Sequence, residues 1–337
     1  MFPEWTWIIG FWIGAAIGSF LNVVIYRLPR GLSIYKPTYS FCPTCNRQLT
    51  ASELVPLLSW LFQKGRCKVC KNKISPRYFI VELVNATLWG AIWYQQFVIG
   101  ADPIKAIGYS LFAAALVAAI FTDLAHYIIP DQINAFMFAT GIGMNIAMIA
   151  NNHPEAYQWG MPGSISGALI GIGVLWGITF LGRIIFRKDA MGHGDIKMAR
   201  GIGAVLFPVG ALISFGLAVV LGAVLGIVMI LVRNRKQVAE QEEDDEPYVP
   251  ESIGSLVKSL FGYLLCIDII GLAFPKLYEM WFDENPYEVD QFEEEPEVEM
   301  TMIPFGPYLA AGALGVVLFP GPLNELVRLY LKQMLGT

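Results

Sequence analysis

The chain has 337 residues, of which 55% are hydrophobic and only 15% are charged, and its formal net charge is −5. Soluble domains average about 25% charged residues, and the mean hydropathy of this chain is +0.52. The composition argues against a pair of soluble domains and predicts a protein built around helices that cross a membrane.

Long apolar runs follow one another along the chain. A run of about 20 apolar residues is long enough to cross a hydrocarbon core of about 30 Å. Six such runs are 5–26, 79–99, 106–122, 132–150, 163–182 and 303–320, and a longer one covers 201–232. We therefore predict an all-α fold, a polytopic membrane helix bundle with about eight spans.

The run 201–232 is too long for one upright helix. Arg200 precedes it and Arg233 follows it, so both of its ends are basic. Basic flanks face the cytoplasm, which favours two short helices joined by a turn near Pro208. The alternative is one long helix with a kink at Pro208, and it would break the charge pattern.

Basic residues are concentrated in a few loops. The loop 27–77 holds ten Lys or Arg and one acid, Glu53, and residues 183–200 hold five more basic residues. The loops near 100–104 and 151–162 hold no Lys or Arg. Because basic loops stay in the cytoplasm, we place the N-terminus outside and the 27–77 loop in the cytoplasm. No basic segment precedes the first span, so we expect it to be retained rather than cleaved as a signal peptide.

Acidic residues gather near the C-terminal end. Residues 240–299 contain 18 of the 28 acids and only two Lys, so the other 21 basic and 10 acidic residues carry a charge of +11. This pattern predicts a solvated insertion, whose apolar stretch 253–275 is either an interfacial helix or another span. The predicted organisation is a first span (1–26), a cytoplasmic loop (27–77), a membrane core (78–232), the acidic insertion (233–302) and a last span with a tail (303–337).

Four cysteines in the cytoplasmic loop form two CxxC pairs. Cys42 and Cys45 make the first pair, Cys67 and Cys70 make the second, and 21 residues separate them. This spacing is typical of a structural zinc site with four thiolate ligands. Two disulfides are the alternative, which the reducing cytoplasm disfavours. We predict a small zinc-binding loop domain, and we expect the fifth cysteine, Cys266, only to pack among apolar residues.

Two aspartates lie at the ends of apolar runs. Asp123 follows the run 106–122, and Asp195 lies in the sequence MGHGDIK before the run 201–232. A carboxylate near bilayer depth is costly and usually marks a functional site. Two of them at cytoplasmic helix ends predict a paired-carboxylate active site. The competing classes are a membrane transporter or ion channel that binds cations with these aspartates, and a zinc-bearing scaffold without chemistry.

Several motifs together resemble one family. They are GSFLNVVIYRLP (18–29), the CPTCN and CKVC pairs, ISPRYFIVEL (74–83), TDLAHYIIPD (122–131), GHGDIKM (192–198) and IPFGPYLAAGAL (303–314). The chain resembles bacterial type IV prepilin peptidases, which combine a leader peptidase with an N-methyltransferase. It departs from the family pattern in the acidic insertion before residue 303 and in Leu54, where a polar residue is frequent.

The resemblance implies a specific chemistry. It identifies Asp123 and Asp195 as the catalytic pair of an aspartyl protease of the GxGD type in the bacterial inner membrane. It implies prepilin or pseudopilin substrates and the lipid bilayer as partners, and no nucleic acid. It also implies N-methylation of the new N-terminus with S-adenosylmethionine as donor, associated with the loop 27–77. The residues that contact this donor are not identified, because no Rossmann-type glycine motif occurs in a strand–turn–helix setting.

Other polar residues near the aspartates receive structural roles. We expect Asp131 to be an N-cap or first-turn acid of the helix that follows, so its replacement by Asn should be mild. We expect His126 and His193 to be structural. Lys197 either places a positive charge near the two aspartates or extends to the membrane interface. Gly192 and Gly194 would allow close approach of backbone to a substrate.

Overall fold

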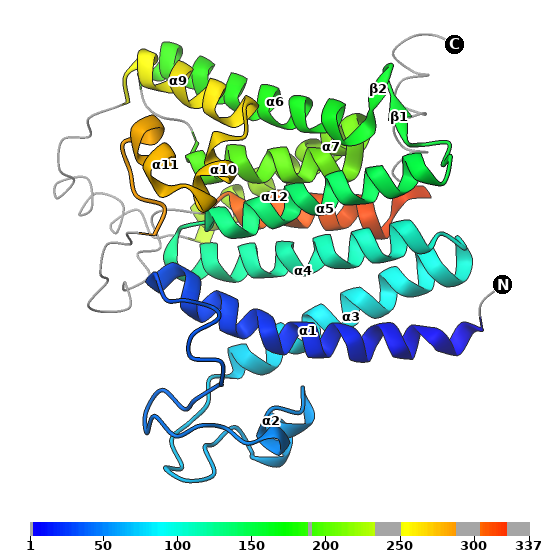
Figure 1. Ribbon diagram of the computed structural model, residues 1–337, viewed down its shortest axis with the longest axis vertical. Helices are drawn as coiled ribbons and strands as arrows, with labels where there is room; N and C mark the ends of the chain where they lie inside the picture. The colour runs from blue at the N-terminus through cyan, green and yellow to red at the C-terminus, as the bar shows by residue number, and fades with distance from the viewer. Residues whose placement is uncertain (1–2, 188–190, 233–250, 288–303, 322–337) are drawn as a thin grey trace.

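The structure is a computed structural model that describes residues 3–187, 191–232, 251–287 and 304–321. Much of the predicted acidic insertion and the C-terminal tail lie outside these residues. Five helices are long and apolar enough to cross a membrane. They are α1 (Trp7–Arg27, preceded by η1, Glu4–Thr6), α4 (Pro103–His126), α5 (Asp131–Ala150), α6 (Gly163–Phe186) and α7 (His193–Val232). Figure 1 shows them lying side by side, which confirms the all-α membrane bundle.

Two shorter segments complete the predicted set of spans. Helix α3 (Pro76–Ile92) continues as a π-helix, η4 (Trp93–Ile99), and α12 (Gly306–Leu318) is the last described helix. Helix α7 is broken at Phe207, whose φ of 60° and ψ of 178° are not helical, and Pro208 follows. With the two halves of α7 taken separately, these helices make eight apolar segments, and the bent pair Ile253–Leu264 and Ile267–Ala273 is a further candidate span.

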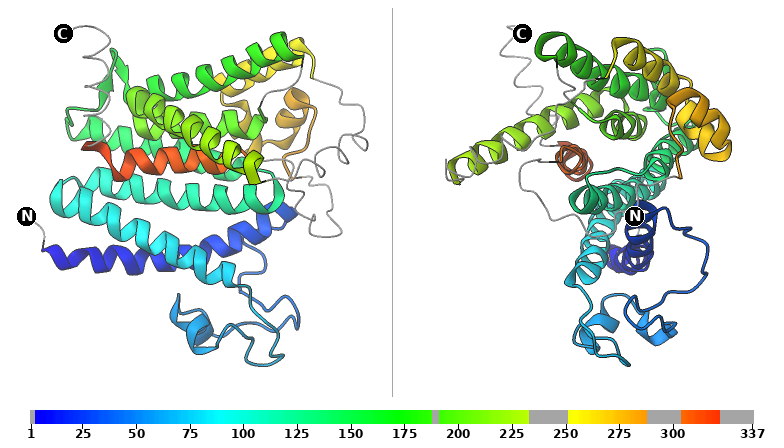
Figure 2. Two further views of the ribbon diagram at one scale, coloured as in Figure 1. Left: turned by 180° about the vertical axis from the view of Figure 1, so that it is seen from behind. Right: turned by 90° about the vertical axis from the view of Figure 1, so that its left-hand side faces the viewer.

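The two halves of α7 run in opposite directions. Gly203 in the first half lies against Gly167 of α6, and Phe207 lies against Gly163 at the start of that helix. In the second half, Ser214 lies against Gly312 of α12, and Gly222 comes back beside the start of α12. The predicted hairpin is therefore confirmed and the single kinked helix is wrong, because Pro208 and the left-handed Phe207 reverse the chain. Figure 2 shows the returning half leaning away from the bundle.

Helices α1 and α3 pack through three glycines of α1 that are four residues apart, a GxxxG spacing that is common where membrane helices make close contact. A Cβ on Gly10, Gly14 or Gly18 would come within 2.7, 2.5 and 2.8 Å of atoms of η4 or α3. The close approach lets Asn85 of α3 donate a hydrogen bond to the carbonyl of Gly14 at 2.6 Å. Small residues thus fix these two helices as an antiparallel pair.

The loop between α1 and α3 folds beside this pair (Figure 1). It contains η2 (Leu28–Arg30), η3 (Ala51–Glu53) and α2 (Leu58–Phe62). Two side chains anchor it. Arg27 donates to the carbonyls of Ser33, Ile34, Pro37 and Tyr39 at 2.9–3.3 Å. Glu82 of α3 accepts the N–H of Leu57 at 2.7 Å.

One end of the bundle, which we call the aspartate end, collects several helix termini. Helix α4 ends there and α5, α7 and α12 begin there, because Lys197 of α7 pairs with Asp131 of α5 and Gly306 of α12 lies against Asp123 of α4. The N-terminus lies at the opposite end (Figure 1). The short strands β1 (Tyr157–Gln158) and β2 (Met161–Pro162) form a hairpin in the loop between α5 and α6.

The apolar part of the insertion forms three short helices at the aspartate end (Figure 1). They are α9 (Ile253–Leu264), α10 (Ile267–Ala273) and α11 (Pro275–Phe282), and α9 and α10 are bent by 71°. Trp176 of α6 donates to the carbonyl of Leu256 at 3.1 Å. The stretch 253–275 is therefore not one straight helix but a bent cover that packs on the bundle.

Candidate active site

Asp123 lies one turn before the end of α4, where the apolar run ends. Its side chain is buried, with 5% of its surface exposed, and its carboxylate accepts a hydrogen bond from the backbone N–H of Gly306. Gly306 is the first residue of α12. The partial positive charge of a helix N-terminus therefore faces the carboxylate and stabilises its ionised form.

Asp195 lies in the first turn of α7. Its carboxylate accepts the backbone N–H of Gly192, and it lies near enough to Asp123 for the two charges to interact. The structure thus brings together the two aspartates that the sequence analysis singled out, although 71 residues separate them in the chain. Like charges held close disfavour ionisation of both groups, so the pair tends to retain one proton.

Gly306 is a site residue that the sequence analysis quoted in a motif but did not single out. A Cβ at this position would collide with the Asp123 carboxylate and lie 2.9 Å from Cδ1 of Ile129. Only glycine therefore lets the start of α12 donate its N–H here. Gly194 differs, since a Cβ there would meet Ile129 only at an ordinary 3.5 Å, and Gly192 faces open space beside Asp195.

Asp131 was predicted to be an N-cap or a first-turn acid, and the second alternative is confirmed. It is the first residue of α5, so it is a first-turn acid, but the N-cap is Pro130 and no side chain caps the helix. Its two oxygens accept hydrogen bonds from Lys197 Nζ, both at 2.8 Å. The hydroxyl of Tyr278 donates to it at 2.6 Å. The N-cap expectation is wrong because the carboxylate turns toward α7 and α11 instead of its own helix.

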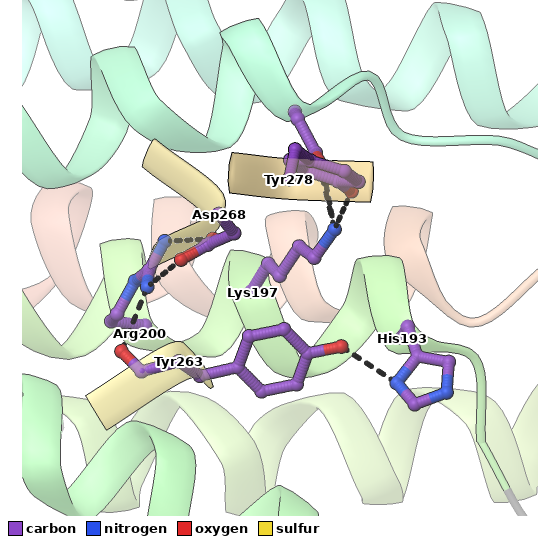
Figure 3. A network of polar contacts seen from close by, with 7 residues as sticks. His193, Lys197, Arg200, Tyr263, Asp268 and Tyr278 are labelled. Atoms are coloured by element: carbon purple, nitrogen blue, oxygen red, sulfur yellow. Dashed lines mark hydrogen bonds and ion pairs between the residues drawn. The ribbon is translucent and has the colours of Figure 1, made fainter. Parts of the chain in front are cut away.

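Of the two predictions for Lys197, extension to the membrane interface is wrong. Its side chain is buried, with 7% exposed, so it does not extend to the interface. It lies two residues after Asp195 on α7, which places the two side chains on different faces of the helix. Its charge is neutralised by Asp131. It lies near the rings of Tyr263 and Tyr278 (Figure 3) and near that of Phe282. Lys197 ties α7 to α5 and α11.

A second ion pair fixes α7 to the bent cover. Arg200 and Asp268 are 1% and 2% exposed at the side chain, and two hydrogen bonds of 2.8 and 2.6 Å join them. Arg200 also donates to the carbonyl of Tyr263 at 3.0 Å (Figure 3). This bidentate geometry is the strong form of an Arg–carboxylate contact. The sequence analysis could not pair them, because Asp268 lies 68 residues further along the chain.

The histidines near the aspartates have partners of their own. His193 lies 2.9 Å from a carboxylate oxygen of Glu251 and 2.7 Å from the hydroxyl of Tyr263. His126 lies 3.4 Å from a guanidinium nitrogen of Arg30. These contacts link α7 to the cover and α4 to the end of α1, in agreement with the structural roles that we expected.

The four loop cysteines meet in one cluster. Their sulfur atoms all lie within 4.8 Å of one another, and those of Cys42 and Cys70 are 3.9 Å apart. Four sulfurs at about 2.3 Å from a tetrahedral zinc ion would be about 3.8 Å apart, so the cluster fits a metal such as zinc. All the cysteines are free thiols, and the disulfide alternative is wrong.

The two CxxC pairs have the same local backbone. In the first, Cys42 donates its N–H to the carbonyl of Arg47 at 3.0 Å, and in the second Cys67 donates to Asn72 at 3.0 Å. Backbone N–H groups of Val69 and Cys70 lower the pKa of Cys67 to about 6. A thiolate is the form of Cys67 that would bind a metal. Burial and the neighbouring thiols raise the pKa of Cys70 to about 11.

A cavity of about 500 Å³ lies between the cysteine loop, α1 and α3. Its walls include the rings of Tyr26, Phe41, Trp60 and Tyr78, and Glu82 also lines it. Pockets for small ligands typically measure about 300–1,000 Å³ and combine apolar walls with a few polar groups.

Comparisons with known proteins cover both parts of the chain. The Bacterial Peptidase A24 N-terminal domain matches residues 12–96, and the Type IV leader peptidase family matches residues 110–227. A prepilin leader peptidase/N-methyltransferase of Myxococcus xanthus is 31% identical over 333 residues, which are 97% of this chain and 94% of the relative. The protein of that name from Aeromonas hydrophila is 34% identical over 244 residues, which are 66% of this chain and 80% of the relative.

A third relative has a narrower name. The type 4 prepilin-like proteins leader peptide-processing enzyme of Escherichia coli is 32% identical over 216 residues, which are 58% of this chain and 75% of the relative. No solved structure matches the chain. The family models, the nearly full-length relative and the apolar helices agree, and the chain belongs to the type IV leader peptidase family of multi-pass membrane proteins.

Proposed function

We propose that this protein is a membrane aspartyl endopeptidase with Asp123 and Asp195 as its catalytic pair. In this mechanism the ionised carboxylate takes a proton from a water molecule, and the water oxygen attacks the scissile carbonyl. The protonated carboxyl donates a hydrogen bond to the carbonyl oxygen, and a proton then passes to the leaving amine. The two roles need two carboxyl groups in different protonation states.

One observation carries this proposal. Two carboxylates from distant parts of the chain meet at the ends of two apolar helices, and each accepts a backbone N–H, from Gly306 and Gly192. The neighbouring acid Asp131 is neutralised by Lys197, which leaves Asp123 and Asp195 as the pair able to exchange a proton. A transporter built on these aspartates is not favoured, because the relatives are named as peptidases.

Substitution of either aspartate by Asn tests the mechanism. An amide has nearly the same shape but can neither take nor give the proton, so we expect cleavage of a prepilin to fall about 10⁴-fold in each variant. The melting temperature should not fall, because removal of a charge at membrane depth relieves a desolvation cost. Near-normal cleavage by either Asn variant would overturn the assignment.

The substrates proposed are type IV prepilins or pseudopilins, cut on the cytoplasmic side of the bacterial inner membrane. The relatives are named for prepilin leader removal, and the basic loop 27–77 is predicted to face the cytoplasm. Reporter fusions after residue 50 should report the cytoplasm, and a periplasmic signal from these fusions would contradict the orientation.

The metal proposed for the cysteine cluster is a structural Zn²⁺ ion. Four thiolates complete its tetrahedral shell and leave no position for a substrate, so the ion would hold the loop together and take no part in cleavage. Metal analysis of the purified protein should find one zinc per chain, and an equal zinc content without Cys42, Cys45, Cys67 and Cys70 would refute the site.

A second proposed activity is N-methylation of the new N-terminus, with S-adenosylmethionine as donor. The relatives carry N-methyltransferase in their names. When bound, the donor supplies an electrophilic methyl group on a positively charged sulfur. The aromatic walls and the acidic Glu82 of the 500 Å³ cavity suit an adenine ring and positive charges. Mass spectrometry of pilin processed with labelled donor should find a labelled methyl group on its first residue.

A further inference from the structure

Glu82 is a buried carboxylate without a cation. It lies in the part of α3 that packs against α1, and 8% of its surface is exposed. The N–H of Leu57 donates to one of its oxygens at 2.7 Å, and the hydroxyl of Ser19 also donates to it. Among the residues that the structure describes, no ion pair involves Glu82.

The surroundings of Glu82 favour a positively charged ligand. A carboxylate offers about four acceptor positions, and the two donors fill only part of this capacity. Glu82 lines the cavity together with Tyr26, Trp60 and Tyr78, and aromatic faces attract cations. An ionisable group at membrane depth is a functional-site candidate whose partner should be named, and here the cavity provides the room for that partner.

The other acid of the cavity is already paired. Glu53 accepts a hydrogen bond from Arg47 at 2.7 Å and from the N–H of Thr50 at 3.0 Å. Arg27 also lines the cavity, but its guanidinium donates hydrogen bonds to backbone carbonyls of the loop. Glu82 is thus the lining carboxylate that is left for a ligand among the described residues.

One residue of the cavity wall contacts the helix that carries Asp123. Arg30 lines the cavity and lies 3.4 Å from His126, three residues after Asp123 on α4. A peptide cut at Asp123 and Asp195 would therefore release its new amino terminus at the aspartate end, close to the part of the cavity wall that contains Arg30. The new terminus carries a positive charge. Among the described residues Glu82 has no positively charged partner, so the new terminus could take that place.

We propose that the cavity between α1, α3 and the cysteine loop is the methyl-transfer site, and that Glu82 binds the α-ammonium group of the cut substrate and takes its proton. This inference rests on the proposed methyltransferase function. The freed amine attacks the methyl carbon of the sulfonium donor, the carbon–sulfur bond breaks, and its electrons stay on sulfur as a thioether. An α-amino group has a pKa of about 7.7–8.0, so it needs this proton removal near neutral pH.

Glu82→Gln separates this role from a structural one. The amide oxygen of Gln can still accept the Leu57 N–H, so the loop keeps its anchor, but the group can no longer take a proton. We expect methylation of a cut pilin to fall about 100-fold or more, while prepilin cleavage and zinc content stay as in the unchanged protein. The matched control is Glu155→Gln, which removes a half-exposed acid in the loop between α5 and α6, away from the cavity, and should still methylate.

The position of the donor is tested without relying on activity. A photoreactive 8-azido analogue of S-adenosylmethionine, added to the full-length protein, should label peptides from 19–30, 40–44 or 72–82. Label confined to α4–α12 would overturn the site even if Glu82→Gln failed to fold. A measured affinity for S-adenosylhomocysteine should be unchanged in Glu82→Gln, since Glu82 is assigned to the amine.

The outcomes distinguish this inference from the function on which it rests. If the unchanged protein transfers no methyl group from S-adenosylmethionine, both are overturned. If the unchanged protein methylates and Glu82→Gln methylates equally well, only the role of Glu82 is overturned. Methylation that is lost in Glu82→Gln and kept in Glu155→Gln, with cleavage intact in both, supports the assignment.

Discussion

The N-terminal unit (α1, the cysteine loop and α3) and the aspartate end are built on opposite principles. In the first, the proposed metal ligands Cys42, Cys45, Cys67 and Cys70 lie within 29 consecutive residues, and both CxxC pairs repeat one local backbone. In the second, Asp123, Asp195 and Gly306 come from three helices that meet only in the folded bundle. The cysteine cluster is made of neighbouring residues that a metal could hold together, whereas the aspartate pair depends on the packing of distant helices.

The difference extends to what holds each region in place. The loop has few buried apolar side chains, and Cys42, Leu57 and Cys67 are its main ones. The aspartate end has buried ion pairs in which Lys197 and Arg200 of α7 meet Asp131 and Asp268. Damage to one region should therefore leave the other working, which the following changes test.

Loss of the metal should have the largest effect, and only on the loop. Structural zinc contributes about 10–16 kcal/mol of folding free energy in small zinc-binding peptides. We expect Cys67→Ser to lower zinc content and to make the loop sensitive to limited proteolysis between residues 40 and 75. Cleavage of a prepilin by Asp123 and Asp195 should fall much less than methylation. Cys266→Ser is the control, and equal losses of both activities in Cys67→Ser would break the comparison.

A buried charge left alone should have the next largest effect, and on the aspartate end. Asp268→Asn leaves Arg200 without its anion, and breaking a buried pair costs about 3–5 kcal/mol. We expect a lower melting temperature in detergent and slower cleavage, with normal zinc content. Replacing both partners at once, Asp268→Leu with Arg200→Met, should recover much of the stability. A double variant as unstable as Asp268→Asn would mean that the ion pair is not the cause.

Asp131→Asn should lower stability more than the loss of a helix-capping side chain would. The amide can still accept the Tyr278 hydroxyl, but it leaves the buried charge of Lys197 uncompensated, at a cost of about 1–3 kcal/mol. We expect reduced stability and cleavage that is slowed but not abolished. Asp131→Asn combined with Lys197→Met should lose less stability than the sum of the two single changes. Complete loss of cleavage in Asp131→Asn, with normal stability, would make Asp131 a catalytic residue.

The smallest effect is expected at Glu53, in the loop. Hydrogen bonds from Arg47 and Thr50 lower the pKa of Glu53 from 4.5 to about 2. A lowered pKa contributes stability above the ordinary value of 4.5, and this contribution disappears as the pH falls toward 2. Glu53→Gln also weakens the capping box of η3, so we expect a loss of about 0.5–2 kcal/mol at neutral pH. Thermal unfolding of the zinc-loaded protein measures it, and an unchanged loop melting temperature would contradict it.

Local patterns in the sequence predicted much of this protein. Hydropathy marks each apolar helix because a span must bury about 20 residues in hydrocarbon. The CxxC spacing predicts the cysteine cluster because each pair folds through its own backbone hydrogen bonds. Gly10, Gly14 and Gly18 predict a helix contact because they repeat every four residues, and the basic flanks of 201–232 predict the hairpin.

The sequence by itself therefore determined which segments are helical and apolar and where the clustered cysteines lie. It also determined which carboxylates lie at the ends of apolar runs. The tertiary structure alone decided the partner of each buried charge, such as Lys197 for Asp131 and Arg200 for Asp268. It also decided that Gly306 must be small and that Glu82 faces a cavity. The physical reason is that hydropathy and spacing record how a residue suits its own helix or loop, whereas the partner of a buried charge depends on which distant helices pack together.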